Sequence, residues 1–506
     1  MPAQPNQPQH TPQEIFELTK KLIAMGDFHE AAQHAAMLRS HFPEQTPILG
    51  IHGVAMAAIG AYGIAIPDLV RTAKDTQEAL DTGESENPNR PRIVDQLLRM
   101  HCELARAYEA LGHTEHTDQS LKDAVDLDPE APEVVRVRVD ILAARGDTAS
   151  AQTILNEANE LGLEELPGAL AAASIALAKP DTAHDELHVL AIRLQALANQ
   201  VGLDASTQSR VLRAAAALFH RAGEYDEAFR SYTRAANFTR GNFDAAVNAQ
   251  LTNAVLQGWA PEAMRKISQP KTENTNRIFI VGAAHSGSTE LAHALTQHPD
   301  VANIGPLDAL TLAAARKAGA RPTPYRPVIP DCTKLRRDQL EGVASIYNRQ
   351  ADGTAKPEGR SVTVDPSILQ AHFVGLAALA FPGAKFVFVR REPHANALAC
   401  FFNGVPGNHP YTKDLATIAS SLRDTDRLLD HWHAAFTELG VTGIETSREA
   451  LAADPAAETR RIAEACGLSP SPTVVGPTFI PHPSDLPEHY TKRLESIESL
   501  LPAARV

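Results

Sequence analysis

The stretch RIFIVGAAHSGSTELAHALTQH, residues 277–298, decides the fold of the second half of the chain. Its four consecutive apolar residues, 278–281, predict a buried strand. Apolar residues at helical spacing then predict a helix that begins near Ser288. The residues between strand and helix, 282–287, predict a tight loop. Such a loop gathers backbone N–H groups at a helix N-terminus, and this arrangement suits an anion.

The loop departs from the usual nucleotide-binding pattern at one position. Residues 282–289, GAAHSGST, fit G-x-x-x-x-G-K-[ST] except that Ser288 replaces the lysine. That lysine reaches the β- and γ-phosphates, so its loss argues against an ordinary ATP or GTP hydrolase and disfavours a P-loop kinase. A glycine turn whose hydroxyls only cap the helix is the structural alternative.

A second apolar run, KFVFV at 385–389, leads straight into Arg390 and Arg391. We expect helices near it at about 367–380, 394–402 and 412–439. Strands that alternate with helices predict a three-layer α/β domain with a mostly parallel sheet. Ligands of such sheets bind beyond the carboxyl ends of the strands. Arg391 lies at such an end, where it could clamp a phosphate in a bidentate manner.

The first half of the chain has a different, helical pattern. A polar linker at 267–276 separates residues 14–266 from an α/β domain at 277–506, and residues 1–13 are expected to form a disordered tail. Four glycines are followed by alanines 5 or 12 residues later, or by a proline 17 residues later. Each glycine would turn the chain between two helices, and the small alanines would let those helices pack closely. The glycines are Gly26, Gly112, Gly146 and Gly223.

These offsets resemble those of tetratricopeptide repeats. The resemblance implies an α-helical solenoid, with degenerate units at about 50–92 and 166–205, that binds a peptide or protein partner. An ordinary helical bundle is the alternative. The uncharged stretch Ile48–Pro67 is long enough to span a bilayer, but its Ala and Gly content favours a buried helix pair.

Composition excludes several classes of function. The net charge of -14 over 506 residues argues against a general nucleic-acid or anionic-membrane binder. The four cysteines are scattered and form no C-x-x-C pair, which argues against a disulfide framework or a zinc site. The polar start is not expected to act as a signal peptide. We therefore expect a cytoplasmic protein.

Five segments of the second half resemble, in order, motifs of the sulfotransferase family, particularly of bacterial members fused to tetratricopeptide repeats. The family motifs are P-R-S-G-T-T, Q-I-L-x-x-H-P-E-V, F-P-x-A-x-I-I-x-x-R-R-D-P, L-x-x-D-P-x-x-E and C-G-L. The resemblance covers about residues 277–470. The matching segments are Ala284–Thr289, Ala294–Val301, Phe381–Pro393, Leu451–Glu458 and Cys466–Leu468.

The resemblance implies transfer of a sulfuryl group from 3′-phosphoadenosine 5′-phosphosulfate to a hydroxyl or amine acceptor, without a metal. Arg391 would hold the 3′-phosphate of this co-substrate. The helical repeats would recruit the acceptor or a partner. The 5′-phosphosulfate would be held by Ala284, His285, Ser286, Gly287, Ser288 and Thr289.

Four positions depart from the family pattern. His285 replaces the loop arginine, Pro306 replaces the acceptor-activating glutamate, and Ala399 replaces a serine. The segment Val364–Ile368 lacks the expected lysine. His285 could itself take a proton, which makes it the catalytic candidate. The alternative function is a catalytically impaired scaffold that binds partners through its repeats.

Other residues could supply the missing groups, although a surface or structural role is favoured for each. Asp308 could replace the lost glutamate, and Lys356 or Arg360 could replace the lost lysine. Asp365, at an expected strand end, is predicted to order the loop there. His298 is predicted to be a residue of a helix C-terminus and not a catalyst.

Overall fold

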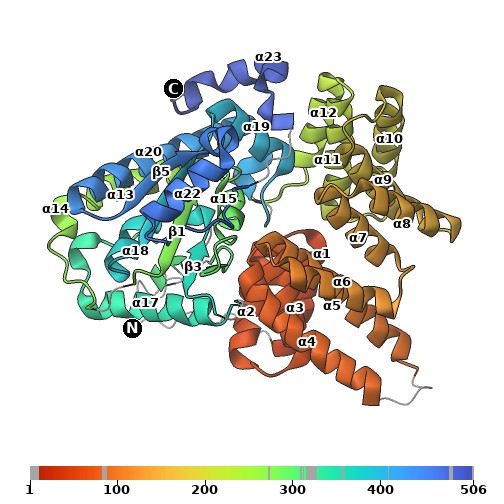
Figure 1. Cartoon of the computed structure of the whole chain (residues 1–506), viewed down its shortest axis with the longest axis horizontal. Coiled ribbons are helices and arrows are strands. Elements are labelled where there is room, and N and C mark those ends of the chain that lie inside the picture. Colours follow the sequence, from red (N-terminus) through yellow and green to blue (C-terminus); the bar gives the residue numbers. More distant parts are fainter. Residues whose placement is uncertain are drawn as a thin grey trace, which may run out of the picture.

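The structure is a computed structural model in which a helical array lies beside a sheet domain (Figure 1). The array occupies the lower and right-hand part of the view, and the sheet domain occupies the left. The residues that the structure describes are 11–82, 88–271, 274–307, 310–311, 313–314, 328–354, 356, 359–407, 409–477 and 483–503.

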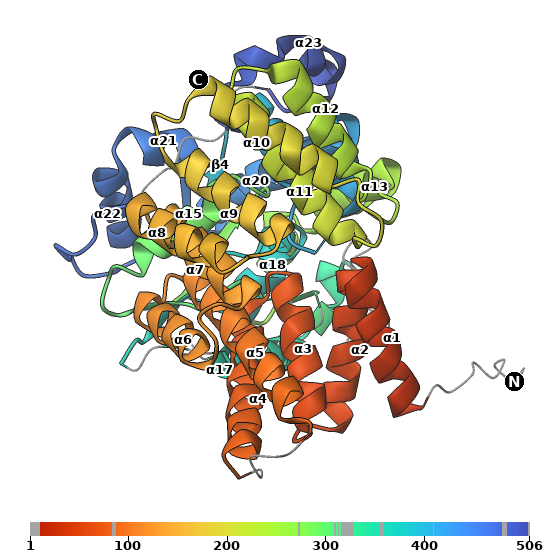
Figure 2. The ribbon, with the colours of Figure 1, turned by 90° about the vertical axis from the view of Figure 1, so that its right-hand side faces the viewer.

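The first half folds into successive antiparallel pairs of helices, which Figure 2 shows side by side. The array curls, because α1 contacts α11. Its helices are α1 (Pro12–Met25), α2 (Phe28–His41), α3 (Thr46–Ala58), α4 (Tyr62–Thr82), α5 (Arg90–Leu111), α6 (Thr114–Leu127), α7 (Pro132–Ala144), α8 (Thr148–Glu160), α9 (Glu165–Ala178), α10 (His184–Leu197), α11 (Ala205–Arg221) and α12 (Tyr225–Ala236).

The glycines singled out in the sequence do turn the chain between paired helices. Gly26, Gly112, Gly146 and Gly223 follow α1, α5, α7 and α11, with φ of 80°, 75°, 85° and 78°. A side chain would strain this left-handed conformation. The helical pairs are therefore as expected, while their assignment as tetratricopeptide repeats stays a prediction. Alanines at the recurring offsets are buried: Ala31, Ala124, Ala151, Ala158, Ala228 and Ala235.

The apolar stretch Ile48–Pro67 is divided between α3 and the first turns of α4, and most of it is buried. This agrees with the expected buried helix pair. Within the described part of the chain, no helix is both long and apolar enough to cross a membrane.

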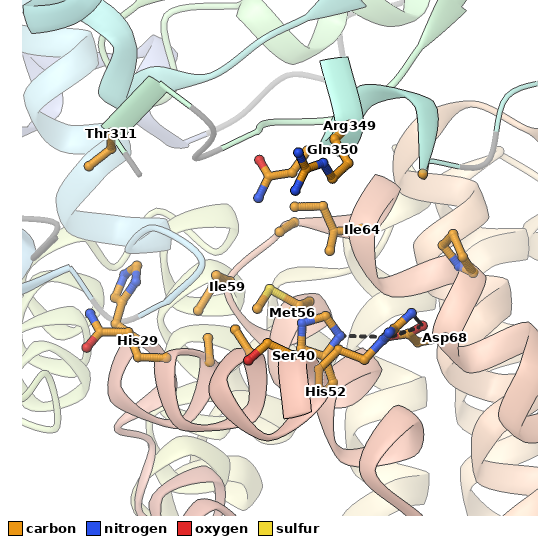
Figure 3. Close-up of a pocket in the computed structure, with 17 residues that line it drawn as sticks. His29, Ser40, His52, Met56, Ile59, Ile64, Asp68, Thr311, Arg349 and Gln350 are labelled. Carbon is orange, nitrogen blue, oxygen red and sulfur yellow. Dashed lines mark hydrogen bonds and ion pairs between the residues drawn. The ribbon is translucent and has the colours of Figure 1, made fainter. Parts of the chain in front are cut away.

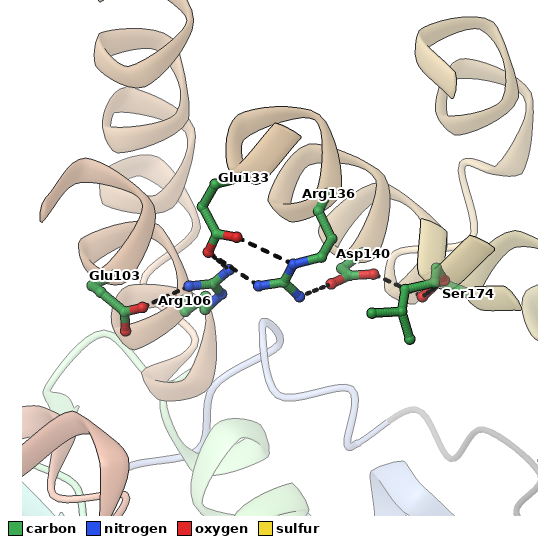
Figure 4. A network of polar contacts seen from close by, with 7 residues as sticks. Glu103, Arg106, Glu133, Arg136, Asp140 and Ser174 are labelled. Carbon is green, nitrogen blue, oxygen red and sulfur yellow. Dashed lines mark hydrogen bonds and ion pairs between the residues drawn. The ribbon is translucent and has the colours of Figure 1, made fainter. Parts of the chain in front are cut away.

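A chain of ion pairs between α5 and α7, extended by a hydrogen bond from Ser174 of α9 to Asp140, connects these three helices (Figure 4). It lies beside a groove of about 1310 Å³. Burial alone would raise the pKa of Glu133, but Arg106 and Arg136 lower it to about 2. The charges in the network therefore largely compensate one another. Its members are Glu103, Arg106, Glu133, Arg136, Asp140 and Ser174.

Five parallel strands form the sheet in the order β2-β3-β1-β4-β5. The expected strands at 278–281 and 385–389 are β1 and β4, and they pair in register with Phe279 opposite Phe386. The parallel sheet is thus confirmed. The strands are β1 (Arg277–Gly282), β2 (Val301–Asn303), β3 (Val362–Asp365), β4 (Lys385–Arg390) and β5 (Gly443–Ser447).

Helices cover both faces of the sheet. Strand side chains alternate between the two faces, so each face presents apolar side chains that the helices bury. Ile278 and Ile280 pack with α15 and α22 on one face. Phe279 and Val281 pack with α17, α18 and α20 on the other. The longer helices of this domain are α15 (Ser288–Leu295), α17 (Arg337–Asp352), α18 (Val374–Ala380), α19 (Pro393–Asn403), α20 (Leu415–Leu439), α21 (Arg448–Ala453) and α22 (Pro455–Ala465).

Short helical turns complete the second half. The region expected as one helix at 367–380 divides into a 3-10 turn, η2, and α18. The short elements are η1 (Cys332–Lys334), η2 (Ile368–Phe373), η3 (Pro410–Lys413), η4 (Pro483–Asp485), η5 (Pro487–Tyr490), α23 (Thr491–Leu494) and η6 (Glu495–Leu500).

Two further helices, α13 (Ala245–Gly258) and α14 (Pro261–Met264), precede the sheet domain. They pack against α20, and Trp259 lies with Trp432 in the core on that face of the sheet. These helices therefore contribute to the core of the α/β fold, although the boundary predicted at residue 266 stays a prediction.

The helical array and the sheet domain share a hydrophobic core. Side chains of α9 to α12 pack with α19, α20 and the C-terminal turns. The rings of Tyr232 and Phe402 stack with centroids 4.0 Å apart. Arg213 of α11 donates hydrogen bonds to the carbonyls of Phe401 and Phe402 at the end of α19. The array therefore holds α19 in place.

The first turn of α4 also meets the end of β2 at very close range. Gly63 lies so near the Ile304 carbonyl that a Cβ at Gly63 would overlap the carbonyl oxygen. We expect Gly63→Ala to lower the free energy of unfolding by about 1–3 kcal/mol, because the backbones must separate. Chemical denaturation measures this. Gly258→Ala is the control, since a Cβ there meets nothing within 4 Å; equal stabilities of the two variants would contradict the close packing.

Candidate functional site

The loop after β1 is shaped by tight packing beneath it. A Cβ at Gly282 would collide with Ser286 Oγ and with the Val389 carbonyl oxygen, so the chain needs glycine there. The Ser286 hydroxyl is fully buried and, among the described residues, has no hydrogen-bond partner. This side chain therefore packs under the loop and does not face the solvent.

Two residues of the loop adopt left-handed backbone conformations. They are His285, with φ 60°, and Gly287, with φ 102°. Alternation of this kind turns successive N–H groups toward one side of a loop, where they can bind an anion. The helix α15 begins directly afterwards at Ser288, so its first N–H groups lie at the same place. The backbone therefore has the form that the sequence predicts for an anion site.

His285 is held as a neutral imidazole. Its Nε2 lies 2.5 Å from the Gly404 carbonyl oxygen, which can only accept, so Nε2 carries the proton and Nδ1 carries the lone pair. Burial lowers the pKa of His285 below its ordinary value. At neutral pH the ring adds no positive charge to the loop, and Nδ1 is the atom that could accept a proton.

Side chains after β4 engage the carbonyl groups of the loop. Asn396 Nδ2 donates to the Ala284 carbonyl at 2.6 Å, and Arg391 Nη1 donates to the His285 carbonyl at 3.0 Å. Asn396 is buried in α19, the helix that Arg213 holds. The loop conformation thus depends on both halves of the molecule.

Arg391 is already part of an ion pair. Its Nη2 lies 2.5 Å from Asp485 Oδ1 and 2.9 Å from Ser484 Oγ, and only 4% of its side chain is exposed. Arg448 Nη1 contacts the same Asp485 oxygen at 2.9 Å. The η4 turn therefore places a carboxylate between two guanidinium groups beside the loop.

Residues of the loop also line a cavity of about 330 Å³. Five of the six predicted loop residues line it, and Ser286 does not. Arg391 lies outside this cavity. The array closes it, since the α3–α4 turn and the end of α5 contribute lining residues. Its lining includes Ala284, His285, Gly287, Ser288 and Thr289, the array residues His29, Ile59, Gly60, Tyr62, Ala110 and Leu111, and Pro306 and Ser367 at strand ends.

The structure also shows the surroundings of the positions at which the sequence departs from the family motifs. Pro306 lines the cavity where the glutamate was expected, and Ala399 is buried. Asp365 accepts hydrogen bonds from Tyr347 and from the Leu307 amide, which agrees with the ordering role predicted for it. Asp308 lies outside the described residues.

Lys356 and Arg360, the suggested substitutes for the lysine, make structural contacts. Lys356 pairs with Asp352 at 3.3 Å. Arg360 donates to the carbonyls of Thr296 and Val301 between α15 and β2. His298 lies beyond the end of α15, is buried, and lies 3.0 Å from the Ser469 carbonyl through Nε2. Each of these side chains supports the fold.

Sequence reasoning missed three residues that matter here: Arg448, Asp485 and His29. Arg448 follows β5, a short strand with a single large apolar residue, so its position at a strand end had no clear signal. Asp485 is distant in sequence from Arg391. His29 belongs to the array but lines the loop cavity. Had residues 443–447 been recognised as a strand, Arg448 would have been expected at its carboxyl end.

A buried histidine of the array anchors η5, the turn that follows the one carrying Asp485. His220 Nδ1 lies 2.8 Å from the Tyr490 hydroxyl, and burial lowers the pKa of His220 to about 4. In the unfolded chain His220 takes up a proton near pH 6.5, whereas in the native state it takes one up only near pH 4. The free energy of unfolding therefore falls as the pH drops from 6.5 toward 4. For His220 we expect a loss of about 3 kcal/mol over that range.

Denaturant unfolding at about pH 7 and about pH 4.5 measures this loss. His220→Gln keeps a hydrogen-bonding side chain but removes the titration. The variant should therefore lose less stability than the wild type on acidification. An identical pH dependence for both proteins would contradict the role of His220.

Among the described residues, no group of three or more His, Cys, Asp or Glu side chains could hold a metal ion. All four cysteines are buried and unpaired with one another.

Comparisons with known proteins agree with this geometry. Residues 277–472 match the model of the sulfotransferase family. The match supports a sulfotransferase family domain at these residues. An uncharacterized protein of Aquifex aeolicus (strain VF5) is 24% identical over 259 residues, which are 48% of this chain and 33% of that protein. The chain thus spans about a third of the length of this relative.

Proposed function

We propose that the chain transfers a sulfuryl group from 3′-phosphoadenosine 5′-phosphosulfate to a hydroxyl or amine acceptor. The observation that carries this proposal is the geometry of residues 283–289, which follow β1 and line a cavity. The guanidinium groups of Arg391 and Arg448 lie beside them. The family match over 277–472 supports the same chemistry.

The residues present fit the two anionic ends of this co-substrate. The N–H groups of the loop and of the first turn of α15 would hold the 5′-phosphosulfate, aided by the hydroxyls of Ser288 and Thr289. Arg391, with Arg448, would hold the 3′-phosphate in place of the Asp485 carboxylate. When bound, the co-substrate supplies the sulfuryl group.

The chain's own residues would orient the reactants and stabilise charge. Fixed N–H donors at the N-terminus of α15 favour negative charge as it develops beside them. The neutral His285, whose Nδ1 carries a lone pair, could accept the acceptor's proton. The array closes the cavity at the α3–α4 turn, which would limit the access of water.

Two measurements test the proposal. Titration calorimetry with 3′-phosphoadenosine 5′-phosphate tests the donor site, and transfer of labelled sulfate to a panel of alcohols and amines tests the reaction. Binding with transfer supports it. Absence of nucleotide binding by folded protein at millimolar concentration would refute it.

A scaffold without chemistry is the second candidate, and specific observations favour it. Pro306 and the carboxylate Glu290 line the cavity, where a general base and positive charge were expected. Arg391 is occupied by Asp485. In this case the groove beside α5, α7 and α9 would bind a protein partner. Nucleotide binding without transfer to any acceptor would select the scaffold.

A further inference from the structure

A second cavity, of about 500 Å³, lies where the array faces the sheet domain (Figure 3). Met56 and Ile64 approach it from α3 and α4, while Arg349 and Gln350 approach it from α17. Its volume is in the range of small-molecule sites. Both halves of the molecule are therefore needed to form it.

This cavity adjoins the one at the loop. His29 and Ile59 line both of them. The α3–α4 turn passes between the two: Gly60 faces the loop cavity, and the next residue, Ala61, faces the larger one. A molecule bound in the larger cavity therefore has one end directed past His29 toward the anion loop.

The charged residues inside the larger cavity compensate one another. Asp68 accepts hydrogen bonds from Arg39 at 2.9 Å and from His52 Nδ1 at 2.6 Å, and it is 6% exposed. Arg39 makes two further hydrogen bonds to the same carboxylate, which uses its acceptor capacity. This cluster ties α2, α3 and α4 together and leaves little charge for a ligand.

The remaining walls are mainly apolar. Ala32, Ala36, Met56, Ile59, Ile64 and Pro67 line the cavity. Arg349 is exposed at its edge. Four uncharged polar side chains also line the cavity, Gln33, Ser40, Thr311 and Gln350. Apolar walls bury an aryl or alkyl body well and give the many hydroxyls of a sugar fewer partners than water does.

We propose that this cavity binds the acceptor, and that the acceptor is an uncharged alcohol with an apolar body. The inference rests on the proposed function, because it takes the loop as the donor site. The helical array then selects the substrate: its α2, α3 and α4 form most of the wall, and the hydroxyl end points toward the loop.

The test uses 2-naphthol as the probe and the full-length protein. Ala36 is half-buried in the cavity wall, so Ala36→Phe places a ring in the cavity without touching the loop. We expect the wild type to bind 2-naphthol, and Ala36→Phe to weaken this binding about tenfold or more. Ala149→Phe, on the exposed side of α8, is the control and should bind like the wild type.

Calorimetry with the bisphosphate nucleotide and a thermal melt, run on the same samples, show whether each variant is folded. If Ala36→Phe does not fold, Gln350→Trp fills the cavity from the opposite side. If the wild type binds 2-naphthol but not the nucleotide, the result would contradict the proposed function and would support the cavity as a binding site for an apolar alcohol. Failure of the wild type to bind 2-naphthol, an unchanged affinity in the folded variants, or equal affinity for glucose would overturn the inference.

Discussion

Replacing Asp485 by alanine should tighten the binding of 3′-phosphoadenosine 5′-phosphate by about 10- to 100-fold. The Asp485 carboxylate contacts Arg391 at 2.5 Å and Arg448 at 2.9 Å, so a phosphate that uses these guanidinium groups must first displace it. Hydrogen bonds to charged groups contribute about 1.5–3 kcal/mol each, and every 1.4 kcal/mol changes an affinity about tenfold. Titration calorimetry measures the change directly.

The same substitution should destabilise the nucleotide-free protein. It leaves Arg391, whose side chain is 4% exposed, as a buried charge without its carboxylate. Removing one partner of a buried pair costs about 3–5 kcal/mol, and the partial exposure of Asp485 reduces that figure here. The nucleotide should restore the lost thermal stability, because its phosphate replaces the carboxylate.

Glu488→Ala is the matched control. Glu488 is an exposed carboxylate three residues beyond Asp485 in the same C-terminal segment, so removing it changes the net charge equally. It should leave nucleotide affinity unchanged. If Asp485→Ala is folded and binds the nucleotide no better than Glu488→Ala does, the carboxylate does not occupy the phosphate site.

The sequence was sufficient for the elements with strong local signals. The apolar runs that became β1 and β4 are buried on both faces, so their pattern is nearly continuous. The glycines that end α1, α5, α7 and α11 need left-handed backbone, which few other residues tolerate. In both cases the residues that determine the element are neighbours in the sequence.

The two edge strands and the ion pair that occupies Arg391 could not be predicted in this way. The edge strands β2 and β5 are short, and β5 has only one large apolar residue, Ile444, so neither has a clear pattern. The contact between Arg391 and Asp485 joins residues that are far apart in sequence. The position of His29 at the loop depends on how the array packs on the sheet, which no local pattern encodes.

Replacing Arg391 by alanine should weaken nucleotide binding by about a hundredfold or more, because truncating a buried charged partner costs about 2–5 kcal/mol. Arg391→Lys should bind with intermediate affinity, since an ammonium keeps the charge but cannot form the guanidinium's paired hydrogen bonds. Calorimetry on both variants gives the order. Equal affinity of the alanine variant and the wild type would exclude Arg391 from the site.

The double variant Arg391→Ala, Asp485→Ala separates binding from folding. Because the two side chains pair with each other, removing both should cost less stability than the sum of the single losses. Nucleotide binding should recover only in part relative to Arg391→Ala, since removing Asp485 still releases Arg448 but the guanidinium of Arg391 is gone. A double variant that binds the nucleotide as tightly as Asp485→Ala would mean that the carboxylate acts through Arg448 alone. Additive stability losses would mean that the ion pair contributes nothing to the fold.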